Sequence, residues 1–361
     1  MKLIHCSDLH LDAKMETGLD PVRARERRVE LLMVFERIVK TAVAQGAEAV
    51  LIAGDLFDTA RASEKTRRLV GTLVADHPEL QFVYVAGNHD EQTAPLFAAD
   101  ASPANWHAFD GNGWSSVHLS DNVVVSGTSA IDRPGIFDIL PTHEGVFHIV
   151  LLHGQIVRGS ETGGERIPLK VLRDRGIDYL ALGHEHDFRC EPLDARGLWA
   201  YAGCPEGRGF DECGIKGCVL VDTDAPIEGR AIFLPQSDRT LHELHVSLDG
   251  CEGFGDVLKC VERSVENIPS KDMVKVVLCG ALPPEVVRDV VHLRKMLEGR
   301  FYFARVKDEC RLLVRAEDYV HDISLKGEFI RTVLASSMSD EQKQRTIECG
   351  LRALRGEEVD A

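Results

Sequence analysis

The chain has 361 residues, of which 44% are hydrophobic and 28% charged, and its formal net charge is −16. This composition excludes disordered, collagen-like and coiled-coil chains, and the length suits about two domains. The acidity argues against a protein that holds nucleic acid by a basic surface of its own, because such domains are usually strongly positive. Chemistry on a polyanion would therefore need another source of positive charge.

Residues 1–239 alternate β-rich runs with helical stretches, which predicts an α/β layer structure. We expect helices from Pro21 to Gln45, with Gly46 as the stop signal, and from about Ser63 to Val74. Near-continuous apolar runs predict strands that are buried on both faces. These runs are Lys2 to Cys6, Glu48 to Ala53, Gln81 to Ala86, Asn122 to Ser126, Val146 to Leu152, Tyr179 to Leu182 and Lys216 to Asp222.

The pattern changes after Arg239, and residues 240–320 are expected to form a small α+β domain. Its predicted elements are strands at Leu241 to Leu248, Val274 to Cys279, Phe301 to Val306 and Arg311 to Val314, a helix before Val265, and a helix that Pro283-Pro284 opens and that ends near Gly299. Residues 321–361 form a predicted helical tail with two apolar stripes. The stripes are Phe329, Val333 and Leu334, and Ile347, Leu351 and Leu354.

The N-terminus and the cysteines favour a cytoplasmic protein. The apolar stretch at Leu3-Ile4 is too short for a signal-peptide core, and no run approaches the roughly 20 apolar residues of a membrane span. We therefore expect no association with membranes. The 10 cysteines are scattered without a CxxC pair, which is typical of reduced thiols rather than of a disulfide framework or a zinc knuckle.

Polar clusters of the metal-ligand type follow the predicted strands. In an open α/β sheet, functional residues collect at the carboxyl ends of strands, so these clusters are expected to meet at one rim. Oxygen and imidazole ligands without thiolates suit manganese, iron or zinc. The clusters are Asp8-Leu9-His10, Gly54-Asp55-Leu56-Phe57-Asp58, Gly87-Asn88-His89-Asp90, His153-Gly154 and Gly183-His184-Glu185-His186.

Any one of these clusters alone is more often structural than metal-binding. Asp8, Asp55 or Asn88 alone, next to Gly or Ser after a strand, is more often a turn former or a helix cap. A single histidine such as His153 is more often a core or surface residue. The ordered recurrence of such clusters after successive strands is what favours a metal site.

In this order the clusters resemble the motifs DxH, GDxxD, GNHD, H and GHxH of the calcineurin-like metallophosphoesterases. The resemblance implies a layered β-sandwich flanked by helices and a site for two divalent ions. It implies these roles: Asp8, His10 and His186 hold one ion, Asn88, His153 and His184 hold the other, Asp55 bridges them, His89 protonates the leaving oxygen, and Asp90 orients the His89 imidazole. Manganese is the expected metal, with magnesium, iron and zinc as alternatives. Two such ions would activate water and polarise a phosphoryl oxygen.

Longer segments resemble the bacterial SbcD-type DNA double-strand-break nucleases and their YhaO-like relatives. These segments are Ile4 to Asp12, Gly54 to Asp58 and Tyr201 to Glu212. The resemblance implies DNA as the substrate, and an SbcC-like coiled-coil ATPase as the partner on which the helical tail docks. The alternative for the tail is packing onto its own chain. A homodimer is a further expectation.

Three other residues are candidates for supporting or substrate-binding roles. Archaeal and eukaryotic members of this family carry His where this chain has Asp58, which favours the bacterial branch. Asp58 is expected to hold a ligand histidine by a hydrogen bond. Arg158 and Arg208 lie near the predicted strand ends, where they would meet backbone phosphates; solvated loop charge is the alternative for each.

The sequence leaves three hypotheses of function open. The first is a manganese-dependent DNA nuclease, exonucleolytic on duplex ends and also endonucleolytic on single strands. The second is a small-molecule phosphodiesterase or phosphatase of the same fold, which the acidic charge favours. The third is a non-catalytic scaffold, against which the complete ligand set and His89 argue.

Overall fold

The computed structural model describes residues 1–15, 18–58, 62–90, 96–97, 102–109, 111–159, 163–284, 286–314 and 316–354. The chain divides into two compact units, Met1–Leu241 and His242–Ala361. None of the described helices is long and apolar enough to cross a bilayer. The cysteines are free thiols, as the sequence predicts.

The first unit contains two six-stranded mixed sheets. The first sheet has the order β14-β13-β1-β2-β3-β4, in which β1 to β4 are parallel. The second has the order β11-β12-β10-β7-β6-β5, in which β6, β7, β10 and β12 are parallel. The strands of the first sheet are β1 (Lys2–Cys6), β2 (Ala49–Ala53), β3 (Gln81–Val85), β4 (Trp106–Phe109), β13 (Gly217–Asp222) and β14 (Ala231–Pro235). Those of the second are β5 (Ser115–Ser120), β6 (Val123–Gly127), β7 (Phe147–His153), β10 (Tyr179–Gly183), β11 (Arg189–Pro192) and β12 (Leu198–Tyr201).

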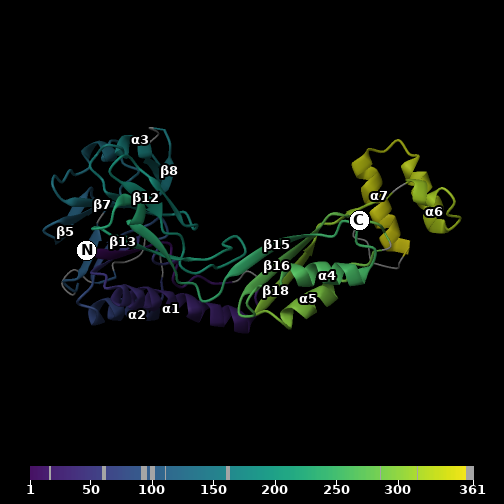
Figure 1. The fold of residues 1–361 in the computed structure, drawn as a ribbon, viewed down its shortest axis with the longest axis horizontal. Helices are drawn as coiled ribbons and strands as arrows, with labels where there is room; N and C mark the ends of the chain where they lie inside the picture. The colour runs from purple at the N-terminus through teal and green to yellow at the C-terminus, as the bar shows by residue number, and fades with distance from the viewer. Residues whose placement is uncertain are drawn as a thin grey trace. The chain divides into compact units, whose positions relative to one another are not determined.

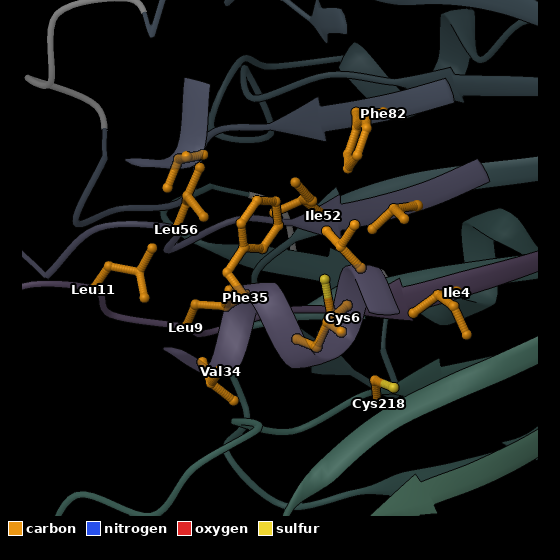
Figure 2. Close-up of a cluster of buried hydrophobic side chains, with 14 of the residues drawn as sticks. Ile4, Cys6, Leu9, Leu11, Val34, Phe35, Ile52, Leu56, Phe82 and Cys218 are labelled. Atoms are coloured by element: carbon orange, nitrogen blue, oxygen red, sulfur yellow. The ribbon is translucent and has the colours of Figure 1, made fainter. Parts of the chain in front are cut away.

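The two sheets pack face to face, and helices cover their outer faces. Successive side chains of a strand point to opposite faces, so Leu3 of β1 joins the core between the sheets while Ile4 and Cys6 join the core beneath the helices. Helices α1 (Pro21–Gln45) and α2 (Glu64–Asp76) run side by side over the first sheet (Figure 1). Figure 2 shows Phe35 of α1 facing the strand residue Ile52.

The outer face of the second sheet is covered by shorter elements. These are η1 (Ile136–Ile139), α3 (Leu169–Leu172) and the two-stranded sheet of β8 (Gln155–Val157) and β9 (Arg166–Pro168), while η2 (Ile227–Gly229) precedes β14. The core there includes Leu152, Leu180 and Trp199. The first unit is therefore a layered β-sandwich flanked by helices, which confirms the predicted fold class.

The second unit is built around a three-stranded sheet of order β15-β16-β18 (Figure 1). Its elements are β15 (Leu241–Ser247), α4 (Phe254–Ser264), β16 (Met273–Cys279), β17 (Ala281–Leu282), α5 (Val290–Glu298), β18 (Phe303–Asp308), β19 (Arg311–Leu312), η3 (Ala316–Tyr319), α6 (Leu325–Leu334) and α7 (Asp340–Leu354). Helices α6 and α7 share a small core of their own. The predicted division into a domain over 240–320 and a tail over 321–361 stays a prediction, and residues 355–361 lie outside the described residues.

One predicted element of the second unit is wrong at its start. The Pro283-Pro284 pair does not open the helix; α5 begins at Val290, where the side chain of Asp289 caps the N–H of His292 at 2.9 Å. An N-cap side chain of this kind accepts a hydrogen bond from a backbone N–H in the first turn of the helix, which a proline side chain does not do. The sequence patterns also failed to indicate the short or edge strands β4, β5, β8, β9, β11, β12, β14 and β17.

Candidate metal centre

Each predicted cluster lies where a parallel strand ends. Asp8 follows β1, Asp55 follows β2 and Asn88 follows β3, and these three strands are adjacent and parallel. His153 is the last residue of β7, and His184 directly follows the parallel neighbour β10. Both sheets therefore deliver their polar residues to one rim, as the sequence predicts.

The first group brings together one carboxylate and two imidazoles. Ligand atoms of Asp8, His10 and His186 all lie within 4.8 Å of one another. The Nε2 atoms of His10 and His186 are 3.3 Å apart, and His186 Nε2 is 4.0 Å from Asp8 Oδ1. Atoms bound to one ion at about 2.0–2.2 Å would lie roughly 3–4 Å from each other. These spacings fit a single metal ion.

The second group is adjacent and shares Asp8. It comprises Asp8, Asp55 and His153, again with ligand atoms within 4.8 Å. Asp55 Oδ2 lies 3.5 Å from His153 Nε2 and 3.7 Å from His10 Nε2, so this carboxylate reaches both groups. That position is compatible with the bridging role predicted for Asp55.

Hydrogen bonds fix which nitrogen of two imidazoles carries the proton. His153 Nδ1 lies 2.9 Å from the carbonyl oxygen of Ala53, and His186 Nδ1 lies 2.8 Å from Glu212 Oε1. Both partners only accept, so each Nδ1 donates, and a neutral ring then presents the lone pair of Nε2 to the site. Lone pairs that converge on buried carboxylates need a cation between them.

Burial strengthens this argument for a cation. Asp8 is 1% exposed and Asp55 is 2% exposed. Isolated carboxylates are very unfavourable at such depth unless they are paired or coordinate a metal. Backbone N–H groups provide some of the hydrogen bonds that these carboxylates require. The N–H of His184 donates to Asp8, and that of His89 donates to Asp55 at 3.0 Å. The donor set of carboxylates and imidazoles fits divalent ions of the kind predicted.

The backbone of the centre is strained. Asp8, His10, Asp55 and His184 all have positive φ, at 52°, 43°, 49° and 106°. Non-glycine residues rarely occupy this region, and such strain is typical of functional sites. Gly87 is required by space, because a Cβ there would lie 2.2 Å from Asp55 Oδ1 and 2.6 Å from its backbone nitrogen.

The two remaining predicted ligands lie beside these groups. Asn88 Oδ1 is 3.0 Å from His153 Nε2, so its amide oxygen faces the second group. The ring of His184 stands edge-on to that of His153 with centroids 5.4 Å apart, and its Nδ1 lies 3.5 Å from Glu165 Oε2. The geometry thus brings all the predicted ligand residues to one place; their ligand roles remain a proposal.

His89 is exposed at the edge of the centre. Its ring packs edge-on against that of His10 with centroids 4.8 Å apart, and its Nδ1 lies 2.9 Å from the main-chain oxygen of Asp58. With Nδ1 donating to that carbonyl, Nε2 is available for a proton. His89 also joins His10 and Asp58 in a further group whose ligand atoms lie within 4.8 Å.

The structure contradicts the predicted contact between Asp90 and the ring of His89. Its carboxylate does not orient the His89 ring but accepts the backbone N–H groups of Leu56 at 2.9 Å and Phe57 at 3.0 Å. Burial raises the pKa of Asp90, which is 3% exposed. Asp90 instead ties its own loop to the loop of Asp55, and the main chain of Asp58 takes the contact with His89.

Glu212 is a functional candidate to which the sequence motifs give no role. It is 3% exposed, and it accepts hydrogen bonds from His186 Nδ1 and, at 2.6 Å, from Arg208 Nη2. Although burial alone would raise its pKa, these bonds hold the pKa of Glu212 well below its ordinary value. A carboxylate behind a ligand histidine fixes the ring and increases its basicity. Glu212 ends the segment Tyr201 to Glu212 that carries the family resemblance, but it is 26 positions from His186 and nothing local indicates a contact between the two.

Arg208 and Asp58 belong to the same network, which agrees with a supporting role for both. Arg208 Nη1 lies 3.1 Å from Asp58 Oδ1, and Asp58 Oδ1 lies 3.3 Å from His10 Nδ1. Arg208 therefore links the carboxylates behind His10 and His186. Arg158 lies apart from this network, exposed beside a neighbouring pocket.

Comparison with known proteins agrees with the geometry. The profile of the calcineurin-like phosphoesterases matches residues 1–188, which include every motif described above. The chain belongs to the calcineurin-like phosphoesterase family. It is accordingly a hydrolase, and the rim of Asp and His side chains is a candidate metal-binding cluster in the position that this metallophosphoesterase fold provides.

Three curated relatives of this phosphoesterase are similar over much of their length. The DNA double-strand break repair protein Mre11 of Aeropyrum pernix is 24% identical over 329 residues, which cover 82% of this chain and 78% of that protein. The Mre11 protein of Haloferax volcanii is 26% identical over 364 residues, covering 97% and 74%. The metallophosphoesterase YhaO of Bacillus subtilis is 28% identical over 253 residues, covering 61% and 57%.

Proposed function

We propose that this phosphoesterase is a dinuclear-metal-dependent DNA nuclease of the SbcD/YhaO type. It would hydrolyse phosphodiester bonds exonucleolytically at duplex ends and endonucleolytically in single strands. The observation that carries the proposal is the convergence of Asp8, Asp55 and three imidazole Nε2 atoms on one small volume. The similarity to proteins named for DNA double-strand break repair supports DNA as the substrate class.

In this proposal each side chain at the rim has a separate role. Asp8, His10 and His186 would hold one ion, Asn88, His153 and His184 the other, with Asp55 between them. Ions bound there would supply Lewis-acid polarisation of a phosphoryl oxygen and activation of water. His89, exposed and with Nε2 available, would give a proton to the leaving oxygen. No covalent bond between enzyme and substrate is needed.

The acidity of the chain shapes this proposal. With a net charge of −16, the protein gains little from long-range attraction to DNA. Two divalent ions would supply local positive charge where the scissile phosphate binds. We therefore expect the protein to bind DNA weakly by itself, and more weakly as the salt concentration rises.

A panel of substrates tests the proposal. Purified protein with manganese, with magnesium or with chelator is incubated with end-labelled duplex, circular single-stranded DNA, a cyclic nucleotide and a phosphomonoester. The nuclease proposal predicts manganese-dependent cleavage of both DNA substrates. Turnover of the small substrates alone would favour a small-molecule phosphodiesterase, which the acidic charge also suits. Absence of turnover with confirmed metal occupancy would favour a scaffold.

We further propose an SbcC-like coiled-coil ATPase as the partner, with α6 and α7 as the docking segment. Part of each apolar stripe packs internally, because Val333 of α6 and Ile347 and Leu351 of α7 are buried in a shared core. Beside this core lies a groove of about 520 Å³ lined by Phe329, Thr346, Cys349 and Ala353, among others. An amphipathic helix of the coiled coil would fit such a groove.

Deletion of residues 325–361 tests the docking. The truncated protein is expected to hydrolyse a small chromogenic phosphodiester at the rate of the full chain, because the metal cluster lies in the other unit. It is expected to lose co-purification with the co-expressed ATPase. Unchanged co-purification would contradict the docking role.

A further inference from the structure

A pocket of about 610 Å³ lies in the first unit, beside the metal cluster. Gln155 lines it two residues after the predicted ligand His153, and Glu185 lines it between His184 and His186. Its inner wall is the end of β12, where Tyr201 Oη donates to the carbonyl of Gly154 and accepts the N–H of Ile156, both at 2.8 Å. The loops that carry predicted ligands thus form part of the pocket rim.

The charges around this pocket are unevenly paired. Arg189 is bound to Glu191, and Asp187 is bound to Lys216. Within the described part of the chain, the guanidinium groups of Arg158 and Arg173 form no hydrogen bond or ion pair, and both side chains are exposed. Glu185 adds a carboxylate to the lining. The two guanidinium groups, which have no partner among the described residues, still suit an anion, because guanidinium matches the geometry of phosphate oxygens.

Aromatic side chains also line this pocket. Phe188 is 39% exposed and packs at a tilt against Phe233 with centroids 4.7 Å apart, so its ring is held in place with part of its surface open. Trp199 also lines the pocket, and the guanidinium of Arg189 lies over its ring, 5.1 Å from the centroid. Flat aromatic and guanidinium surfaces are what unpaired nucleobases stack on.

We propose that this pocket, the Arg158 pocket, binds one nucleotide of the substrate strand next to the scissile bond. Arg158 and Arg173 contact its phosphate, and its base stacks on Phe188 and the guanidinium of Arg189. The volume lies within the range of pockets that hold small ligands. The proposal rests on the proposed nuclease function, and it adds positioning residues that the metal cluster alone does not provide.

Binding without turnover tests this proposal separately from the nuclease function. The full-length protein is titrated in excess chelator against 2-aminopurine deoxyribonucleoside 5′-monophosphate, whose fluorescence is quenched when the base stacks. Inorganic phosphate and the unphosphorylated deoxynucleoside are tested as competitors. The variants are Arg158→Gln combined with Arg173→Gln, Phe188→Leu, and Arg166→Gln. Arg166 is an exposed arginine of neighbouring β9 that does not line the pocket, so it is the matched control.

We expect saturable quenching by the wild-type protein, affinity at least tenfold lower in the double arginine variant, and affinity about fivefold lower with weaker quenching in Phe188→Leu. Arg166→Gln should bind as the wild type does. Thermal unfolding of each variant verifies that it is folded. Absence of quenching by the folded wild-type protein, or equal loss in Arg166→Gln and the double variant, would overturn the proposal. If the pocket fails these tests but the protein still cleaves DNA, the nuclease proposal stands and only the pocket proposal is overturned. If the nucleotide binds saturably but no DNA is cleaved, the nuclease proposal is overturned.

Discussion

The Nδ1 atom of His186 lies 2.8 Å from Oε1 of Glu212, a buried carboxylate outside the five ligand motifs. This contact holds the imidazole so that Nε2 faces His10 across 3.3 Å. Hydrogen bonding to Glu212 also raises the pKa of His186. A metal ion at Nε2 would therefore compete with a proton for this ring.

Loss of the Glu212 charge should weaken metal binding without unfolding the protein. Glu212→Gln keeps an acceptor for His186 but removes the negative charge, and changes behind a metal ligand typically cost tenfold to a hundredfold in affinity. Competition with a chelating dye measures the change. The control is Glu64→Gln, an exposed residue of α2 that pairs with its helix neighbour Arg68. Equal affinity in the two variants would contradict the role of Glu212.

Gly87→Ala should displace Asp55 and abolish metal binding. The new Cβ would lie 2.2 Å from Asp55 Oδ1 and close to the Asp55 backbone, so the loop carrying Asp55 must move. Gly229→Ala is the control, because nothing lies within 4 Å of a Cβ at that position. Metal content of the purified proteins measures the effect. A Gly87→Ala protein that retains full metal content would show that Asp55 does not hold metal in this geometry.

His89→Ala should keep the metal ions and lose most of the rate. His89 is exposed, and its side chain donates to a main-chain carbonyl rather than completing the two ligand groups that share Asp8. A general acid typically contributes about 10²–10⁴-fold to a rate. Hydrolysis of DNA and metal content are measured on the same preparation. Loss of metal together with activity would assign His89 to the ligands.

Two buried histidines predict that the first unit loses stability in mild acid. Burial lowers the pKa of His5 to about 3 and that of His148 to about 4, from 6.5. Below pH 6.5 the unfolded chain therefore binds protons that the folded chain excludes, and the free energy of unfolding falls as the pH falls toward these values. The slope is about 1.4 kcal/mol per pH unit for each histidine.

Urea unfolding between pH 7 and 5 measures that slope, and His148→Asn provides the comparison. The variant removes one of the two titrating groups, so its stability should depend less steeply on pH than that of the wild type. Identical slopes in the two proteins would contradict the assignment for His148.

The sequence predicts the central strands and the rim well because both depend on local patterns. Strands such as β1 and β2 are near-continuous apolar runs, and each is followed by a polar cluster that the parallel arrangement brings to one edge. Edge strands such as β5, with alternating exposure, give a weaker signal in the sequence. The position of β5 depends on its pairing with β6 across a register shift, which no local pattern encodes.

The supporting contacts of the site are less predictable because they join distant segments. Glu212 reaches His186, and Arg208 reaches Asp58 across 150 positions. The sequence predicts that Asp90 contacts its neighbour His89, but the tight turn at Gly87 to Asp90 directs the carboxylate toward the backbone of Leu56 and Phe57. Adjacency in sequence is therefore a poor guide to which side chains touch in this loop.

Titration of manganese into metal-free protein, with release of nucleotides from end-labelled duplex DNA as the readout, tests the central claim most directly. A dinuclear nuclease predicts no release in chelator and a rate that reaches its plateau at about two ions per chain. The Asp55→Asn protein should give no such plateau. Release that is already maximal at one ion per chain, release that persists in chelator, or no release by fully loaded protein would contradict the account.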